Sequence, residues 1–281
     1  MEDKMFEVGN TPLLGIKTAS GLEVLVKDES ENPFGTFKDR KSKEVAEFAE
    51  ATGIDYVMAI TSGNYGFSLS NFLSAVGIKT VLFVPDGIDK HVLERLDQKA
   101  IVIPVDLEEQ ELTTEKLEAI ANRNLNLVGS RVINATNFYD DAYLDIFREI
   151  RRDLKHKEPD YVILPCGSGE LFAATLRYYH LSNTKIIAVT TDNPDTKASM
   201  LYARYRPSLD IVLARGDPAR YNLIRATESE ILRTYDWAKG KINCEPSSAA
   251  AFAAFERYKG VFKPSDTIVV LNTGNGMRNF S

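Results

Sequence analysis

Short apolar runs alternate along this chain with longer stretches in which apolar residues recur at helical spacing. Such runs between turn residues predict strands, and the longer stretches predict amphipathic helices. The predicted strands are residues 22–26, 56–60, 80–84, 100–105, 125–128, 161–165, 185–190 and 267–271. The predicted helices follow Lys38, Gly66 and Gly169 and cover residues 89–97, 114–122, 138–154, 227–237 and 246–258. This alternation favours an α/β fold, with mostly parallel sheets flanked by helices. Residues 192–223 are polar and irregular, and we predict no element there.

Composition narrows the class of protein. A chain of 281 residues can bury a large core and predicts two domains. Its content of 44% hydrophobic and 26% charged residues is typical of a globular protein. The formal net charge of −6 argues against a nucleic-acid partner, because it offers no basic surface.

Neither metal binding nor membrane insertion is indicated. Cys166 and Cys244 lie far apart, and the three histidines (His91, His156, His180) stand singly, so we expect no metal site. No apolar run approaches the ~18 residues that a membrane span needs, and the first residues contain no apolar signal core. We therefore expect a cytoplasmic protein with no membrane partner.

The most informative stretch runs from Asn32 to Arg40 and reads Asn-Pro-Phe-Gly-Thr-Phe-Lys-Asp-Arg. A turn built on Asn-Pro and Gly is expected to deliver Lys38 to the start of a helix. The helix dipole at that place would lower the pKa of Lys38 and make its amine a better nucleophile. From these residues alone, a solvated first turn is the commoner explanation.

Two further turns join a predicted strand to a predicted helix, where backbone N–H groups can face an anion. Residues 61–66 read Thr-Ser-Gly-Asn-Tyr-Gly, and residues 166–171 read Cys-Gly-Ser-Gly-Glu-Leu. The second lacks the third glycine of a Rossmann fingerprint and the lysine of a Walker A motif. Taken alone, the first turn is as compatible with a plain connection as with a binding site. The second favours the plain connection.

The stretch around Lys38 resembles the cofactor-lysine motif of pyridoxal-phosphate (PLP) enzymes with the tryptophan-synthase β fold, also called fold type II. The resemblance is greatest to threonine synthases, where the motif reads Asn-Pro-Thr-Gly-Ser-Phe-Lys-Asp-Arg; Phe34 and Thr36 are the departures. Gly-Asn-Thr-Pro-Leu at 9–13, Glu-Pro-Ser-Ser-Ala-Ala at 245–250 and Thr-Gly-Asn-Gly at 273–276 extend it over nearly the whole chain. The last segment is similar to threonine synthases and differs from cysteine synthases.

The resemblance implies a PLP site and roles for particular residues. Lys38 would hold PLP as a Schiff base and act as general base, and Asn64 would bond the 3′-oxygen. Thr273 would meet the ring nitrogen, and the phosphate would lie on residues 167–169. The implied cofactor ligands are Lys38, Asn64, Gly167, Ser168, Gly169 and Thr273. The implied substrate ligands are Thr61, Ser62, Gly63, Asn64, Tyr65 and Tyr139.

Domain organisation also follows from the resemblance. It implies a larger PLP-binding domain of residues 1–40 and 131–281, and a smaller α/β domain of residues 41–130. It further implies a homodimer.

Two residues depart from the family pattern. Glu170 stands where glycine is usual, so we expect its carboxylate to point away from the PLP phosphate. Tyr139 stands where threonine synthases carry an arginine that binds the substrate phosphate. A phosphate dianion prefers a bidentate arginine.

We therefore expect a PLP-dependent lyase resembling threonine synthase, which performs elimination or replacement on an amino acid such as O-phosphohomoserine in amino-acid biosynthesis. The first alternative is a cysteine-synthase-like sulfhydrylase or a serine/threonine dehydratase on the same fold. The alternative from another class is a non-catalytic protein that binds an amino acid or phosphate.

Overall fold

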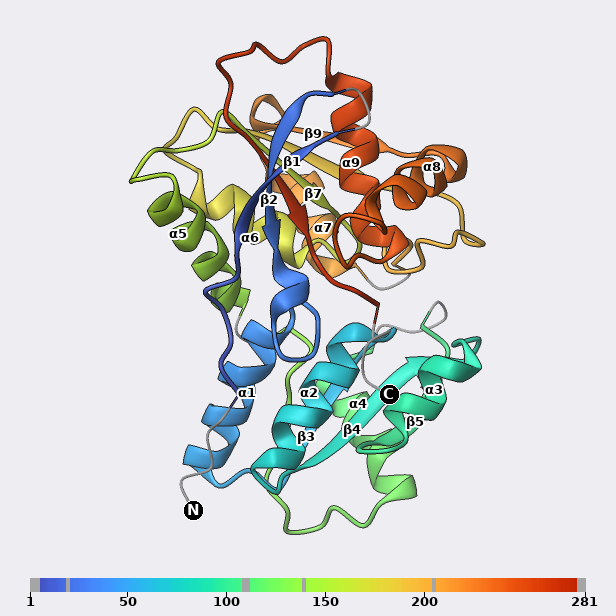
Figure 1. Cartoon of the computed structure of the whole chain (residues 1–281). Coiled ribbons are helices and arrows are strands. Elements are labelled where there is room, and N and C mark those ends of the chain that lie inside the picture. The colour runs from blue at the N-terminus through green and yellow to red at the C-terminus, as the bar shows by residue number, and fades with distance from the viewer. Residues whose placement is uncertain (1–5, 19–20, 108–111, 138–139, 204–205, 277–281) are drawn as a thin grey trace. The chain divides into compact units, whose positions relative to one another are not determined.

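The computed structural model describes residues 6–18, 21–107, 112–137, 140–203 and 206–276. The chain divides into two compact units. The smaller unit comprises Met1–Val8 and Lys38–Ala142, and the larger unit comprises Gly9–Phe37 and Tyr143–Ser281. Each is made of strands and helices in alternation (Figure 1). One boundary between the units is the peptide bond between Phe37 and Lys38.

The compact units differ from the predicted domains at residues 1–8, 38–40 and 131–142, which group with the smaller unit. For the last of these segments the reason is strand pairing, since β6 (Val132–Asn134) lies beside β3 (Tyr56–Ile60) and extends that unit's sheet. The predicted division into a PLP-binding domain and a smaller domain stays a prediction.

The larger unit is built on a sheet whose order, in the described residues, is β1-β2-β10-β7-β8-β9. Its strands are β1 (Leu13–Lys17), β2 (Glu23–Asp28), β7 (Tyr161–Pro165), β8 (Lys185–Thr190), β9 (Tyr221–Arg225) and β10 (Ile268–Asn272). β1 runs antiparallel to β2, and every other pairing is parallel. Because parallel strands end at the same edge, the segments after β2, β7 and β10 all leave from one edge of this sheet.

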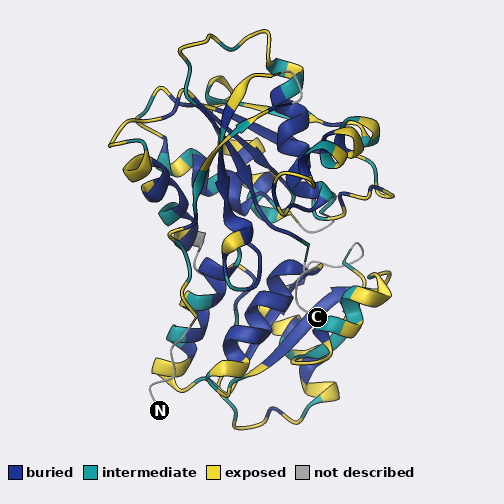
Figure 2. Ribbon diagram, in the orientation of Figure 1, coloured by how far each residue is buried: buried dark blue, intermediate teal, exposed yellow. Residues whose placement is uncertain are grey.

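Helices cover both faces of that sheet. Ile163 and Val270 belong to a core with α8 (Glu228–Ala238) and α9 (Pro246–Tyr258). Val162 and Val269, one position away, belong to a core with the helices of the opposite face. Those helices are α5 (Leu144–Asp153), α6 (Glu170–Tyr178) and α7 (Pro207–Arg215). The central strands are therefore buried on both sides, as their dark blue colour in Figure 2 shows.

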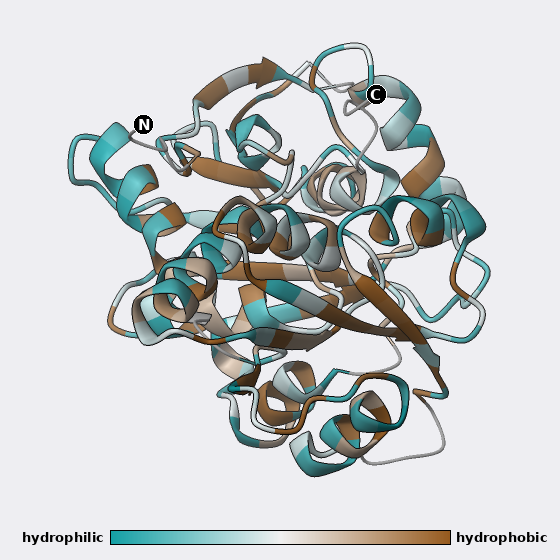
Figure 3. Ribbon diagram, turned by 90° about the horizontal axis from the view of Figure 1, so that it is seen from below, coloured by the Kyte–Doolittle hydropathy of each residue, from teal (hydrophilic) through white to brown (hydrophobic). Residues whose placement is uncertain are grey.

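The smaller unit contains a parallel sheet whose order, among the described residues, is β5-β4-β3-β6. The other two strands are β4 (Lys79–Pro85) and β5 (Ile101–Val105). The helices are α1 (Asp39–Thr52), α2 (Asn64–Ala75), α3 (Lys90–Leu96) and α4 (Thr114–Asn124). α2 contacts both α1 and β4 and is buried over most of its length. Figure 3 colours the chain by hydropathy and shows several brown strands beside helices that mix brown and teal.

Three sequence-based predictions of secondary structure need correction. Residues 125–128 form no strand. Leu127 belongs to a loop and is buried, whereas Val128 is 89% exposed. The edge strand forms at β6 instead. The helix predicted at 138–154 is divided into a 3₁₀-helix, η2 (Asp140–Tyr143), and α5; residues 138–139 lie outside the described part. Residues 192–223 contain α7, η3 (Pro218–Arg220) and the start of β9.

The missed elements have local causes. Pro207 resembles a helix breaker in the sequence, but it occupies the first turn of α7, where its missing N–H costs nothing. β9 is an edge strand with a mixed burial pattern, so it lacks the apolar run of the central strands. None of the helices in the described part of the chain has the length and apolar character that a membrane crossing requires.

Candidate active site

Lys38 begins helix α1 in the smaller unit. It occupies the N-cap position with helical dihedral angles, and its carbonyl accepts a hydrogen bond from the Ser42 N–H at 2.9 Å. Its Nζ atom lies 5.5 Å from the centre of the Tyr65 ring. The Lys38 side chain is partly exposed, whereas the four residues that follow it are buried.

The buried first turn rules out the solvated turn that the residues alone favoured. Lys41 is fully buried; its Nζ donates to the Thr136 carbonyl at 2.8 Å and lies 4.8 Å from the Tyr65 ring centre. Ser42 accepts a hydrogen bond from Ser68 of α2 at 2.8 Å. The start of α1 is therefore anchored within its unit, which gives Lys38 a fixed base.

The turn at residues 61–66 lies in the same unit and is held by its own threonine. Thr61 Oγ1 accepts hydrogen bonds from the N–H groups of Gly63 at 3.2 Å and Gly66 at 2.9 Å. A Cβ on Gly66 would meet the Thr61 methyl at 2.5 Å, so only glycine fits there. Tyr65 donates its hydroxyl to the Ala135 carbonyl at 2.7 Å. The structure therefore brings Tyr65 of the predicted substrate turn beside Lys38.

The Gly167–Gly169 turn follows β7 at the sheet edge of the larger unit. A Cβ on Gly167 would lie 2.1 Å from the Met200 carbonyl oxygen. Gly169 has φ +93°, and a Cβ there would lie 2.3 Å from the Leu209 nitrogen. Close backbone neighbours thus require both glycines whether or not a ligand binds.

The hydrogen bonding of the backbone N–H groups is a better indication of an anion site than the glycines are. Among the described residues, the structure shows no acceptor for the backbone N–H groups of Gly167, Ser168 and Gly169. These groups precede α6, whose N-terminus favours negative charge. The turn therefore offers donors of the kind that hold a phosphate.

Glu170, the unusual residue in this turn, is 8% exposed at the first position of α6. Its Oε2 atom accepts a hydrogen bond from the Tyr143 hydroxyl at 3.4 Å. Tyr143 is fully buried in the larger unit. The carboxylate is thus directed toward the residue that precedes α5.

Thr273 directly follows β10, and its hydroxyl is hydrogen-bonded to the hydroxyl of Ser248 in α9. The two side-chain oxygens lie 2.8 Å apart, and both residues are buried. Ser248 Oγ also accepts from the Gly274 N–H at 3.0 Å and donates to the Gly274 carbonyl at 3.1 Å. Ser248 lies in the segment 245–250 that resembles threonine synthases, but the sequence alone predicts no role for its hydroxyl.

The segment after β10 is joined to the turn that leads to Lys38. Phe37 donates its N–H to the Thr273 carbonyl at 3.0 Å, and Asn275 donates its own to the Gly35 carbonyl at 3.0 Å. Gly35 has φ +72°, and a Cβ there would meet the Asn275 amide at 2.2 Å. Thr273 is therefore held to the residue immediately before Lys38.

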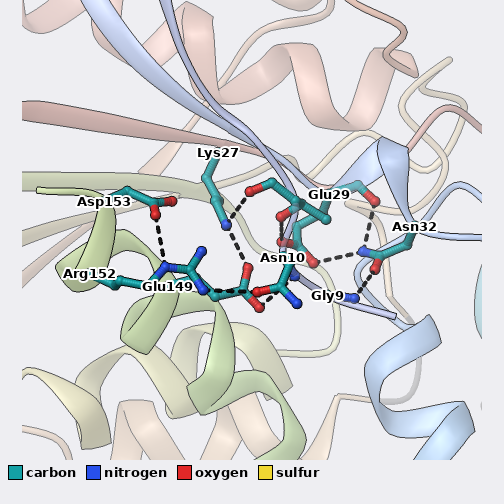
Figure 4. A network of polar contacts seen from close by, with 9 residues as sticks. Gly9, Asn10, Lys27, Glu29, Asn32, Glu149, Arg152 and Asp153 are labelled. Atoms are coloured by element: carbon teal, nitrogen blue, oxygen red, sulfur yellow. Dashed lines mark hydrogen bonds and ion pairs between the residues drawn. The ribbon is translucent and has the colours of Figure 1, made fainter. Parts of the chain in front are cut away.

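A buried polar network holds the start of the same turn (Figure 4). Asn32 accepts from the Gly9 N–H at 2.9 Å and donates to Glu29 Oε2 at 2.9 Å. Glu29 Oε1 accepts from the Thr11 hydroxyl at 2.6 Å. Glu29 belongs to the 3₁₀-helix η1 (Glu29–Glu31), directly after β2.

The network continues through a buried ion pair. Lys27 is fully buried, and its Nζ lies 2.6 Å from both Glu149 Oε2 and the Thr11 carbonyl oxygen. Glu149 Oε1 accepts the Asn10 N–H at 2.9 Å. The Asn32 turn is thereby linked through the Gly-Asn-Thr-Pro segment to α5.

Other candidate chemistry is limited. Burial raises the pKa of the Cys166 thiol to about 12, so this group stays protonated and is a poor nucleophile. The described residues contain no group of three or more His, Cys, Asp or Glu side chains that could hold a metal ion. Tyr139, the predicted substrate ligand, lies outside the described residues.

Comparison with known proteins gives the class of this protein. The family model described as "Pyridoxal-phosphate dependent enzyme" matches residues 4–274. Threonine synthase from Synechocystis sp. is 23% identical over 302 residues, which cover 96% of this chain and 77% of the relative. Cysteine synthase from Flavobacterium sp. is 25% identical over 230 residues, which cover 77% and 68%. A hydrogen sulfide-producing enzyme from Fusobacterium nucleatum superposes with a TM-score of 0.78 at 23% identity, over 97% of each chain.

The chain belongs to the pyridoxal-phosphate-dependent enzymes, with fold type II and pyridoxal 5′-phosphate as cofactor. This confirms the fold and the cofactor expected from the sequence. The chemical groups fit PLP: an amine at Lys38, N–H groups at 167–169 that have no acceptor among the described residues, and a buried hydroxyl at Thr273 suit its aldehyde, phosphate and ring nitrogen.

Proposed function

We propose that this protein is a PLP-dependent lyase resembling threonine synthase, acting on an amino acid with a leaving group on its side chain. The observation that carries the proposal is the bonding of the Thr273 segment to the residue before Lys38. That bonding attaches the segment of Thr273 to the residue that directly precedes Lys38 in the chain. PLP itself, when bound, supplies an electron sink for charge at the substrate α-carbon.

Each proposed ligand has a role that its own chemistry allows. The Lys38 amine, partly exposed at a helix start, binds the cofactor aldehyde and moves the α-proton on Nζ. The N–H groups of residues 167–169 hold the phosphate, and Asn64 bonds the 3′-oxygen. The turn of residues 61–65 binds the substrate carboxylate through its backbone and side-chain donors.

Thr273 sets the electronic character of the site. A hydroxyl donates a hydrogen bond to the ring nitrogen without supplying the negative charge that an aspartate would use to keep that nitrogen protonated. The resulting electron sink is milder, which favours elimination or replacement over transamination. Ser248 has only one hydrogen, which can point either to the Gly274 carbonyl or to Thr273. In the second arrangement Thr273 accepts from Ser248, and its own hydrogen is left to donate to the ring nitrogen.

Replacing Ser248 with alanine tests this positioning role. We expect Ser248→Ala to weaken PLP binding about tenfold, or roughly 1.4 kcal/mol, because the Thr273 hydroxyl loses its orienting partner. Stability should fall by about 1–3 kcal/mol, since the buried Gly274 N–H loses its acceptor. PLP affinity by fluorescence titration and urea unfolding measure the two effects.

Thr184→Ala is the matched control. It also removes one buried hydroxyl, which donates to the Pro159 carbonyl at 2.8 Å, but it lies just before β8, at the opposite strand ends from Thr273. Its stability should fall while PLP affinity stays unchanged. Equal PLP affinity in wild type and Ser248→Ala would show that Ser248 does not position Thr273.

Substrate choice is tested with a panel of amino acids. Threonine synthase and cysteine synthase both occur among the relatives, at 23% and 25% identity, so the leaving group needs a direct assay. We expect weak to moderate formation of threonine from O-phosphohomoserine, because Tyr139 stands where an arginine would bind the substrate phosphate. A charge-assisted hydrogen bond contributes roughly 1.5–3 kcal/mol, so Tyr139→Arg should raise kcat/KM for O-phosphohomoserine about tenfold or more.

The same variant should leave O-acetylserine and serine turnover little changed, since neither carries a phosphate. Activity of the wild type on O-acetylserine or serine alone would assign it to the sulfhydrylases or dehydratases. PLP binding without turnover of any of the three would favour the non-catalytic alternative. The homodimer expected from the resemblance stays a prediction, which light scattering would test.

A further inference from the structure

A cavity of about 490 Å³ lies in the larger unit between α8 and α9, on the face of the sheet that these two helices cover. None of the proposed PLP ligands lines it. Its volume falls within the ~300–1,000 Å³ typical of small-molecule sites. The cavity therefore has room for a ligand that the PLP chemistry does not use.

The floor of the cavity is aromatic. Trp237 of α8 and Phe252 of α9 meet edge to face, with ring centres 5.3 Å apart, and Phe255 lies one turn further along α9. Phe252 and Phe255 are buried, and Trp237 is partly exposed. The α8 lining residues recur three and four positions apart, so they share one helix face. Trp237 is therefore the ring that a planar group can reach, and Lys241 Nζ lies 5.4 Å from the centre of that ring.

Among the charged side chains that line the cavity, one cation has no acidic partner in the described residues. Glu230 is paired with Arg257, at 3.1 Å to Nε and 2.6 Å to Nη2. Burial raises the pKa of Glu230, but hydrogen bonds from Arg257 and Thr227 outweigh this and lower it to about 2, so the pair stays charged at neutral pH. Lys259 pairs with Glu256 at 3.4 Å. Arg233 is exposed and has no acidic partner among the described residues.

We propose that this cavity binds a small aromatic monocarboxylate, with its ring against Trp237 and its carboxylate on Arg233. One cation without an acidic partner calls for one negative charge, and a guanidinium matches a carboxylate through two parallel hydrogen bonds. The aromatic floor calls for a flat ring, because rings pack in offset or edge-to-face arrangements. The proposal is independent of the proposed reaction at Lys38.

The chain supplies its own reporter for the test. Trp237 is the single tryptophan of the protein, so intrinsic tryptophan emission reports on this cavity. The PLP-loaded protein is titrated with benzoate and, separately, with benzamide, which has nearly the same shape but no charge. Benzoate should change the emission saturably. Benzamide should bind at least tenfold more weakly, because it cannot pair with Arg233.

Three variants separate the cavity from general effects. Arg233→Gln should weaken benzoate binding at least tenfold, whereas Arg215→Gln, an exposed arginine of α7, should bind like wild type. Ala253→Leu, which places a larger side chain into the cavity wall, should abolish the saturable change. The proposal fails if wild type shows no saturable change, if benzamide binds as well as benzoate, or if Arg233→Gln binds benzoate like wild type.

Discussion

Replacing Lys38 with alanine should abolish the covalent attachment of PLP and reduce turnover by about 10²–10⁴-fold, the usual contribution of a positioned acid–base group. The physical reason is that the partly exposed amine at the start of α1 is both the proposed attachment point and the proposed base. Treatment with borohydride followed by peptide mapping should place the reduced adduct on Lys38 in the wild type and find none in the variant.

Lys43→Ala is the control for this experiment. Lys43 lies on the same helix, where it forms a partly exposed ion pair with Glu47, and it should keep both the adduct and full turnover. A reducible adduct of undiminished yield in Lys38→Ala would show that another lysine carries the cofactor. Loss of activity in Lys43→Ala would point to a general effect on α1.

Replacing Lys27 with methionine should lower the free energy of unfolding by about 3–5 kcal/mol, because it leaves the Glu149 carboxylate buried without its cation. The two side chains are 0% and 11% exposed, and Lys27 also donates to the Thr11 carbonyl. Denaturant unfolding monitored by circular dichroism measures the loss. The same network holds Asn32 at the start of the Lys38 turn, so we also expect weaker PLP binding.

The double variant Lys27→Met/Glu149→Leu should recover much of this stability, because no uncompensated charge then remains in the core. Lys43→Met removes the cation of a more exposed pair and should cost less than about 1 kcal/mol. If Lys27→Met were as stable as Lys43→Met, the buried pair would contribute little to the fold. If the double variant were the least stable of the three, the removed hydrogen bonds, and not the charge, would be decisive.

The structure changes how the Gly167–Gly169 turn is understood. In the sequence its glycines suggested a weak phosphate motif. In the fold they are required by the Met200 carbonyl and the Leu209 backbone, and phosphate binding is supported instead by N–H groups that have no acceptor in the described part of the chain. For this turn, the hydrogen bonding of the backbone N–H groups therefore says more about function than the glycine pattern does.

The sequence by itself determined the central strands, most of the alternation of strands and helices, and the family. Central strands such as 161–165 are apolar throughout because both faces are covered, so a local pattern suffices to predict them. The nine residues around Lys38 were specific enough to indicate PLP, and the family match agrees. Both signals lie in short stretches of sequence, so they can be recognised without knowledge of the fold.

Only the tertiary structure decided what depends on contacts between distant residues. The edge strand formed at β6 and not at 125–128, because pairing with β3, rather than apolar content, selects an edge strand. The Ser248–Thr273 pair joins residues 25 positions apart, and the Lys27–Glu149 pair joins residues 122 apart. No local pattern encodes such pairs, since each forms only when the sheet brings separate segments to the same place.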